Sequence, residues 1–418
     1  MVDGYVHPDF EAVADVFADQ VGRTSGGASV CVYHRGEVVV DLWGGVRDSD
    51  GTPWDADTLA MCFSTTKGVA STAVHICAER GLIDYDTPVC EYWPEFAQNG
   101  KGGILVRHIL AHSAGLHGLR RIVDDASDML DWDTMVAALA AAEPAYAPGT
   151  HAGYHALTYG WLAGELVRRV SGKPLDRFVE EDLCRPLGID GIYLGCPPEQ
   201  RHRIAQLRPV GLPTAAEPAM GRIGKKIGKP FGQFLSLVHS PVNTRRIINA
   251  FAPRGVEDVL WGSEVLDAVI PAANGFLSAR GLARMYAMIA GGGEIDGVRL
   301  LSPERVRTIA TTQNRKPDRL LVVPMCWRLG YHIVVTSKGV DHEALGHFGF
   351  GGSGGWADPK RDIAIAMVCN RGTGSPLGDL RLVRLGGAAI DGARAARSGA
   401  GPGPGPEDQA TPRRAAAM

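Results

Sequence analysis

The sequence has no excess of charge of either sign, because 43 Lys and Arg residues stand against 46 Asp and Glu residues, for a net charge of −3. Nucleic-acid binding through phosphates needs a basic surface, so this balance argues against a nucleic-acid partner. No apolar run approaches the ~20 residues that span a bilayer. Residues 1–9 lack the basic start and apolar stretch of a secretory signal. We therefore expect a cytoplasmic protein without a transmembrane segment, and peripheral membrane or cell-wall association stays open.

Paired cysteines and metal-binding patterns are also missing. The eight cysteines are scattered and none forms a Cys-x-x-Cys pair. Their mostly apolar neighbours predict buried free thiols rather than disulfides or zinc ligands. Five histidines lie close together in the sequence, but they show no His-Glu-x-x-His spacing and no carboxylate completes a ligand set. They are His108, His112, His117, His151 and His155. We expect no metal and no organic cofactor.

What the sequence does contain is 45% hydrophobic and 21% charged residues, the composition of a globular protein with a sizeable core. Alternating apolar residues predict strands at both ends of the chain, and most of the middle shows helical spacing. We expect an α+β fold in which the two β-rich ends join in one antiparallel sheet flanked by helices. The middle would form a large helical inserted lobe, and a cleft between the lobes is the natural pocket.

The expected boundaries follow from this layout. Residues 1–60 plus 320–396 would form the discontinuous sheet lobe, and residues 61–319 the mainly helical lobe. From residue 397 to 418 the chain is rich in Gly, Pro and Ala, which predicts a disordered tail. The segment 198–260 is the least readable. Its basic stretch 222–229 is either a solvated flap over the pocket or a site for anionic partners.

The stretch around Ser64 carries the first chemical signal. It reads Ser64-Thr65-Thr66-Lys67 and continues into a small, apolar run that predicts a buried helix. Residues three apart share a helix face, so the Ser64 hydroxyl and the Lys67 amine would be neighbours. A serine is a weak nucleophile until a base takes its proton, and a lysine can be that base if burial lowers its pKa. The bland alternative is a serine that merely begins a helix.

Further motifs stand in a fixed order along the chain. They are Asp41-Leu42-Trp43-Gly44-Gly45, the stretch 106–116, Tyr154-His155-Ala156 and His347-Phe348-Gly349. The stretch 106–116 is expected to be a helix that ends at Gly115. With Ser64-x-x-Lys67, this order resembles the serine β-lactamase-like superfamily over residues 8–395. That superfamily includes class C β-lactamases, D-alanyl-D-alanine peptidases and family VIII carboxylesterases.

The resemblance implies roles for individual residues. Ser64 would attack the acyl carbonyl and Lys67 would help to deprotonate it. Tyr154 would share the base role and later activate water or protonate the leaving group, which requires nearby cations such as Lys67 to stabilise its phenolate. The backbone N–H groups of Ser64 and Phe350 would form the oxyanion site. Gly349 would let the substrate approach closely.

Two departures from the class C pattern shape the functional hypothesis. Ala156 stands where an asparagine would hold a β-lactam side chain, and His347 replaces the lysine that would bind the antibiotic carboxylate. A histidine is neutral for much of the time near pH 7, and Phe348 adds an apolar ring. Both changes resemble the family VIII esterases. The predicted substrate-binding set is therefore His347, Phe348, Gly349 and Phe350.

We therefore expect a serine carboxylesterase that hydrolyses small esters with short to medium acyl chains through an acyl-enzyme. The alternatives are β-lactam or D-alanyl peptide hydrolysis, acyl transfer to an acceptor alcohol, and a non-catalytic binding protein. A Gly-x-Ser-x-Gly pattern surrounds Ser353 and not Ser64, but a nucleophile elbow needs a helix after it and a strand is expected there. A homo-oligomer is compatible with the sequence, which does not specify one.

Overall fold

The computed structural model describes residues 1–24, 26–207, 250, 253–371 and 380–398. The basic stretch 222–229 lies outside the described residues, as do residues 399–418 of the tail expected from residue 397. Residues 397 and 398 are instead the end of a helix (Leu380–Ser398).

A seven-stranded antiparallel sheet joins the two ends of the chain, with the strand order β1-β3-β2-β12-β11-β10-β9. In its middle β12 pairs with β2, so that Ala366 lies opposite Cys31. The predicted joining of the β-rich ends is thus confirmed. The strands are β1 (Val2–Val6), β2 (Gly27–His34), β3 (Glu37–Gly45), β9 (His332–Thr336), β10 (Gly339–Phe348), β11 (Gly354–Asp358) and β12 (Ile363–Cys369).

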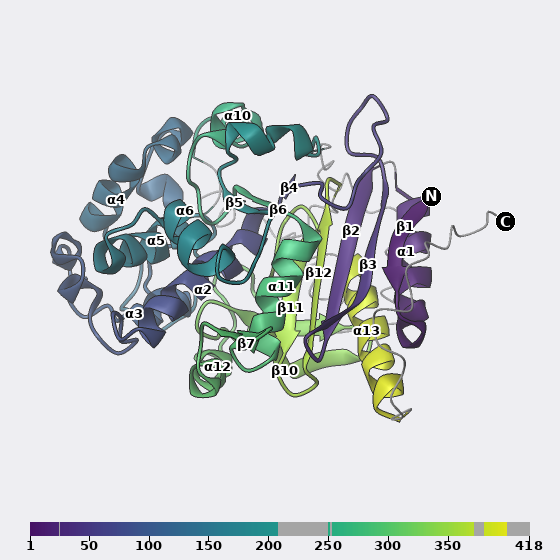
Figure 1. Cartoon of the computed structure of the whole chain (residues 1–418). Helices are drawn as coiled ribbons and strands as arrows, with labels where there is room; N and C mark the ends of the chain where they lie inside the picture. Colours follow the sequence, from purple (N-terminus) through teal and green to yellow (C-terminus); the bar gives the residue numbers. More distant parts are fainter. Residues whose placement is uncertain (25, 208–249, 251–252, 372–379, 399–418) are drawn as a thin grey trace.

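Helices cover both faces of this sheet (Figure 1). On one face α1 (Glu11–Gly22) and α13 (Leu380–Ser398) pack together, and a cluster containing Phe10, Phe17 and Leu385 fills the space beneath them. On the other face α11 (Ala279–Ala290) lies against β2, β11 and β12. The division of the chain at residues 60 and 320 stays a prediction, and α11 lies on the sheet although it falls between those boundaries.

The second lobe is helical and stands beside α11 in Figure 1. Its central helix α2 is buried from Thr66 to Ala78 and packs against α5. The remaining helices are α3 (Val106–Leu110), α4 (Trp132–Ala141), α5 (Thr158–Ser171), α6 (Leu175–Phe178) with a π-helical turn (Val179–Cys184), α10 (Val256–Trp261) and α12 (Pro303–Ala310). Two small sheets contain β4 (Ala60–Met61), β6 (Gly275–Leu277) and β5 (Ile192–Leu194), and β7 (Glu294–Ile295) and β8 (Val298–Arg299).

Two helices begin or end differently from the sequence expectation. α2 (Thr66–Glu79) starts two residues after Ser64, which lies in a 3-10 turn (Phe63–Thr65). The helix expected over 106–116 ends at Leu110, because His112 has a φ of 54°, outside the helical region. The carbonyl of His112 accepts a hydrogen bond from Gly153 N at 2.9 Å, and its Nδ1 accepts one from His155 N at 3.1 Å. These bonds hold the chain in the turn that stops the helix.

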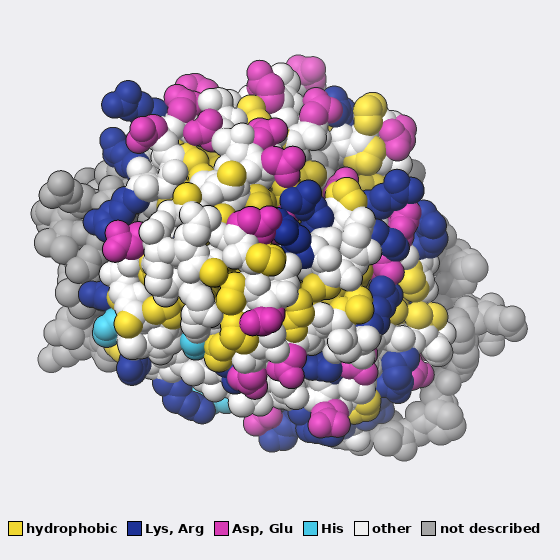
Figure 2. All heavy atoms as spheres, turned by 90° about the vertical axis from the view of Figure 1, so that its left-hand side faces the viewer, with side chains coloured by type: hydrophobic (Ala, Val, Ile, Leu, Met, Phe, Trp, Pro, Cys, Tyr) yellow, Lys and Arg dark blue, Asp and Glu magenta, His cyan; other side chains and the backbone are white. Residues whose placement is uncertain are grey.

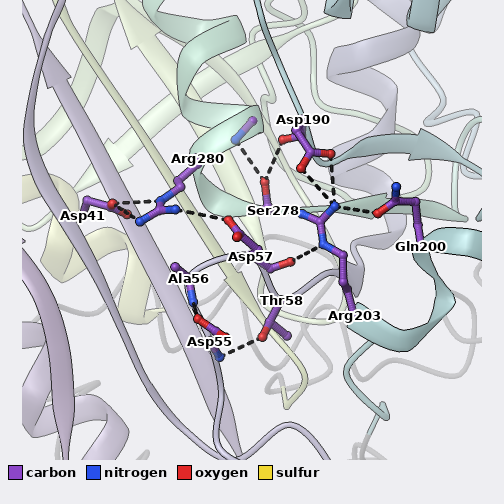
Figure 3. Close-up of polar contacts among 11 residues, drawn as sticks. Asp41, Asp55, Ala56, Asp57, Thr58, Asp190, Gln200, Arg203, Ser278 and Arg280 are labelled. Atoms are coloured by element: carbon purple, nitrogen blue, oxygen red, sulfur yellow. Dashed lines mark hydrogen bonds and ion pairs between the residues drawn. The ribbon is translucent and has the colours of Figure 1, made fainter.

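Arginine side chains link the sheet to the second lobe (Figure 3). At the start of α11, Arg280 pairs with Asp41 of β3 at 2.7 Å and with Asp57 at 3.1 Å. Its guanidinium also lies over the Trp43 ring, 5.4 Å from the centroid. Nearby, Arg203 pairs with an Asp190 oxygen at 3.0 Å and donates to the Asp57 carbonyl at 2.9 Å. The Asp41-to-Gly45 motif thus anchors the helix that covers the sheet.

The outer face of the helical lobe carries charges of both signs. Figure 2 shows Lys and Arg side chains interspersed with Asp and Glu, with hydrophobic side chains between them. A nucleic-acid interface needs a basic stripe or patch, and this view of the described residues shows none. Among the described residues, no helix combines the length and hydropathy needed to cross a bilayer.

A close contact between α5 and the segment before β6 gives the first prediction. A Cβ at Gly160 would lie 2.6 Å from Ala272 N and 2.8 Å from Pro271 C, both backbone atoms. We expect Gly160→Ala to lower the free energy of unfolding by about 1–3 kcal/mol, because backbone must move to make room. Urea unfolding measures this.

The matched control is Gly22→Ala in the last turn of α1, where a Cβ would meet nothing within 4 Å. This change should leave stability within about 0.5 kcal/mol of the parent protein. Equal effects of the two substitutions would contradict the contact.

Candidate active site

The turn that carries Ser64 is held from both sides. Phe63 has a φ of 46°, in the left-handed region that a bulky residue rarely adopts, and such strain is typical of functional sites. The Thr66 hydroxyl donates to the Phe63 carbonyl at 2.6 Å and accepts from Gly275 N at 3.0 Å. Cys62 N donates to the Gly275 carbonyl at 2.8 Å. Hydrogen bonds to Gly275, the first residue of β6, therefore help to set the position of the serine.

The glycine-rich loop after β10 clamps the same turn. The Ser353 carbonyl accepts hydrogen bonds from Thr65 Oγ1 at 2.9 Å and from Gly349 N at 2.8 Å. A Cβ at Gly349 would lie 2.3 Å from the Cys62 carbonyl oxygen. Gly349 thus allows close approach of the protein's own backbone, rather than of substrate as the sequence suggested. The Ser353 hydroxyl is buried and bonded to Cys369, with Cys369 N donating to it at 3.1 Å.

Three side chains from distant parts of the chain meet at Ser64. The Lys67 Nζ lies 2.9 Å from Ser64 Oγ, and the Tyr154 hydroxyl donates to the same oxygen at 2.7 Å. Lys67 comes from the first turn of α2, and Tyr154 from the loop before α5. The Ser64 residue itself is 8% exposed. The structure therefore brings the predicted serine, lysine and tyrosine together, and their catalytic roles stay predictions.

Lys67 is fully buried, and burial lowers its pKa well below the usual value of a lysine. Its second hydrogen-bond partner is the Ala272 carbonyl at 3.1 Å. The loop that presents this carbonyl is held by buried Asn274, whose amide accepts from Ile270 N and donates to the Val265 and Ala268 carbonyls. This environment favours the neutral amine, the form that can accept a proton from a serine.

Tyr154 is held in its protonated form. Burial raises its pKa above the usual range of a tyrosine, and the charge of Asp318 raises it further. In the resting site the phenol is favoured, because Lys67 favours its neutral form. A phenolate that a Lys67 ammonium stabilises during the reaction stays a prediction. Tyr154 is therefore placed as a hydrogen-bond donor to Ser64.

Comparisons with known proteins identify the family of the chain. The sequence model of the beta-lactamase family matches residues 13–388. The chain belongs to the beta-lactamase family. It is 42% identical to an esterase/beta-lactamase, LipL, of Mycobacterium tuberculosis, over 88% of this chain and 83% of the relative.

Solved structures of similar proteins cover almost the whole chain. One is a family VIII carboxylesterase, with 34% identity, a TM-score of 0.80, and 94% of this chain and 100% of the other covered. Another is a penicillin-binding protein homologue from Caulobacter crescentus, with 34% identity, a TM-score of 0.79, and 93% and 100% covered. As a member of the beta-lactamase family, the protein is a serine hydrolase.

The family's third motif is occupied by His347 of β10. Its Nδ1 lies 3.1 Å from the Phe348 carbonyl, which can only accept, so Nδ1 carries the proton. Burial lowers the pKa of His347 well below its usual value, with a further lowering by His332 and Lys67. Its ring lies 6.3 Å from that of Tyr154. A neutral imidazole therefore stands beside the site where class C β-lactamases are expected to have a cation.

The two phenylalanines predicted to bind substrate, Phe348 and Phe350, lie in different surroundings. Phe348 packs with Leu382 and Trp356 in the cluster under α13, so the structure does not bring its side chain to Ser64. The reason is strand geometry, because successive side chains point to opposite faces of a sheet. Phe350 lies beside Phe63, with ring centroids 5.9 Å apart, and the Trp261 ring lies 5.8 Å from that of Phe63.

Three residues near the site belong to no sequence motif that would have identified them. Asn274 holds the loop that bonds Lys67, and Asp318 and Trp327 contact Tyr154. Asn274 lies in an Ala-Ala-Asn-Gly stretch that could have indicated a tight turn. Within the described ranges, no three His, Cys, Asp or Glu side chains gather as metal ligands would.

Buried histidines give a prediction for acid stability. Burial lowers the pKa of each of five histidines. The pKa is about 4 for His332 and about 3 for His75, and it lies well below the usual value of a histidine for the other three. The set is His75, His112, His155, His332 and His347. The unfolded chain takes up protons near pH 6.5 while the folded protein does not, so stability falls as pH drops through that value.

Between pH 7.5 and 5.5 each such histidine should remove roughly 1 kcal/mol, and the set several kcal/mol. Urea midpoints at the two pH values measure the change. In His75→Gln, which lies away from Ser64, the loss on acidification should be smaller. A midpoint that does not move with pH would show that these rings are not buried in solution.

Proposed function

We propose that this protein is a carboxylesterase that hydrolyses esters with short to medium acyl chains through an acyl-enzyme on Ser64. The observation that carries the proposal is the meeting of a buried amine and a phenol at one serine oxygen, at 2.9 and 2.7 Å. Such distances are those of a nucleophile within reach of its base. The names of two relatives, an esterase/beta-lactamase and a family VIII carboxylesterase, support the ester as substrate.

In the proposed reaction, neutral Lys67 takes the Ser64 proton as Oγ attacks the ester carbonyl. The negative charge that develops on the carbonyl oxygen is met by backbone N–H groups, and Phe350 N is a candidate because it has no hydrogen-bond partner among the described residues. As the C–O bond breaks, the leaving alkoxide takes the Tyr154 proton, and the Lys67 ammonium restores the phenol. Water then attacks the acyl-enzyme by the same steps in reverse.

The surroundings of Ser64 favour an uncharged, apolar substrate. The rings of Phe350 and Trp261 each lie against the ring of Phe63 in the nucleophile turn, and Trp261 is 46% exposed. Aromatic rings of this kind can bury an acyl chain. His347 offers no positive charge to an anionic group. Both features support an ester rather than a carboxylate-bearing antibiotic.

The first test replaces the nucleophile. Ser64→Ala should lower kcat for p-nitrophenyl butyrate by ~10⁴-fold or more, as in other serine hydrolases. The matched control is Ser353→Ala, at the serine of the Gly-x-Ser-x-Gly pattern, which should keep most of the activity. Unchanged turnover in Ser64→Ala would reject the proposal, and so would strong nitrocefin turnover by a protein that leaves esters intact.

The second test is the pH dependence of kcat/KM for ethyl butyrate, followed by titration of the released acid. The rate should rise with pH as Lys67 loses its proton, at a pH below the usual value of a lysine. Because burial raises the pKa of Tyr154, the rate should not fall again near pH 10. Lys67→Arg, which keeps the charge at all these pH values, should be inactive throughout. An activity of Lys67→Arg that follows the parent profile would contradict the role of Lys67.

A further inference from the structure

Asp318 is a buried carboxylate that belongs to none of the catalytic motifs. Only 1% of the residue is exposed, and its hydrogen-bond partners among the described residues are uncharged N–H groups. A buried carboxylate is costly unless hydrogen bonds compensate its charge. Its Oδ1 accepts three such bonds from backbone N–H groups, those of Tyr154 at 3.2 Å, Leu320 at 2.8 Å and Leu321 at 3.0 Å.

The other oxygen of Asp318 holds the ring that stacks on Tyr154. Oδ2 accepts a hydrogen bond from Trp327 Nε1 at 2.9 Å. The Trp327 ring lies parallel to the Tyr154 ring, with an interplanar angle of 8° and centroids 5.5 Å apart. Asp318 therefore holds Tyr154 in two ways. It bonds the Tyr154 backbone N–H directly, and it holds the Trp327 ring that stacks on the Tyr154 ring.

Asp318 also differs in charge from the other groups around Tyr154. The titratable side chains near the phenol are Lys67 of α2, His112, Tyr159 of α5, His347 of β10 and Asp318. Burial lowers the pKa of Lys67, His112 and His347, which favours their neutral forms. Of these five described side chains, Asp318 is then the charged one, and a negative charge opposes loss of the Tyr154 proton.

We propose that Asp318 is a positioning residue that, together with Trp327, holds Tyr154 as the neutral acid that protonates the leaving alcohol of the ester. This inference rests on the proposed esterase function and deepens it. The proton passes from the Tyr154 hydroxyl to the alkoxide as the C–O bond breaks, and the Lys67 ammonium returns a proton to the phenolate. Lys67 alone then serves as the base toward Ser64.

The experiment compares two esters with the same acyl group. The ethoxide of ethyl butyrate needs a proton in order to leave, whereas p-nitrophenolate leaves readily without one. Asp318→Asn keeps the shape of the side chain but removes the charge, and its amide NH₂ cannot accept from the Trp327 indole. We expect kcat/KM for ethyl butyrate to fall about tenfold or more, with a much smaller fall for p-nitrophenyl butyrate.

Two further measurements separate this role from general damage to the fold. In a Tyr154→Phe background, Asp318→Asn should have little additional effect on ethyl butyrate, because both changes remove the same acid. Glu165→Gln is the matched control, since Glu165 is another buried carboxylate that accepts an indole N–H, from Trp132 at 3.0 Å. It should leave the ratio of the two kcat/KM values unchanged.

Equal losses for the two esters in Asp318→Asn, or losses that multiply with those of Tyr154→Phe, would overturn the inference. If Asp318→Asn does not fold, Trp327→Phe decides, because it keeps the stacked ring and the charge but loses the indole donor. A selective loss on ethyl butyrate then supports the inference, and an unchanged ratio overturns it. Failure of the esterase proposal itself is seen separately, as a parent protein that hydrolyses neither ester.

Discussion

Removal of the Lys67 amine from water is the constraint on which the rest of the site depends. Every residue of α2 from Thr66 to Ala78 is buried, and no carboxylate contributes to the lowered pKa of Lys67. An ammonium ion in such a place is strongly disfavoured, so burial alone favours the neutral amine that the proposed mechanism uses as its base. The fold therefore has to close over Lys67 from all sides. The clamp of the Gly349-to-Ser353 loop on the turn before α2 is part of this closure.

The burial that favours a neutral Lys67 amine also favours neutral side chains around it. A charged imidazole at His347 would oppose a proton on Lys67 still further and would itself need a partner that the site lacks. The buried histidines instead use their ring nitrogens for backbone bonds. His155 Nε2 accepts from Leu116 N at 3.0 Å, and His332 Nε2 accepts from Phe348 N at 3.3 Å. Their number near one site reflects a need for small polar side chains that stabilise loops without adding charge. Asp318 is the exception, and it lies behind Tyr154 rather than beside Lys67.

Local rules predicted the elements and the nucleophile pair, and long-range contacts decided the rest. The three-residue spacing of Ser64 and Lys67 and the alternating strands at both chain ends were readable, and the structure confirms the antiparallel sheet. The same alternation places the Phe348 side chain on the other face of the sheet from His347, so the location of Phe348 could have been predicted. Asp318 could not, because a single aspartate in a loop carries no pattern until folding sets it against Tyr154. Nor does the sequence reveal that Gly349 makes room for Cys62.

Electrostatics also explains why one scaffold can favour esters over antibiotics. A β-lactam brings a carboxylate into the site, and a class C enzyme is expected to meet it with a lysine. Here the same position holds His347, and binding an anion would require protonation of an imidazole whose pKa burial already lowers. A neutral ester needs no such protonation, and its chain can lie against Phe63, Phe350 and Trp261. In the proposed reaction, the burial that favours neutral Lys67 would also disfavour charged substrates, because both effects arise from the same exclusion of water.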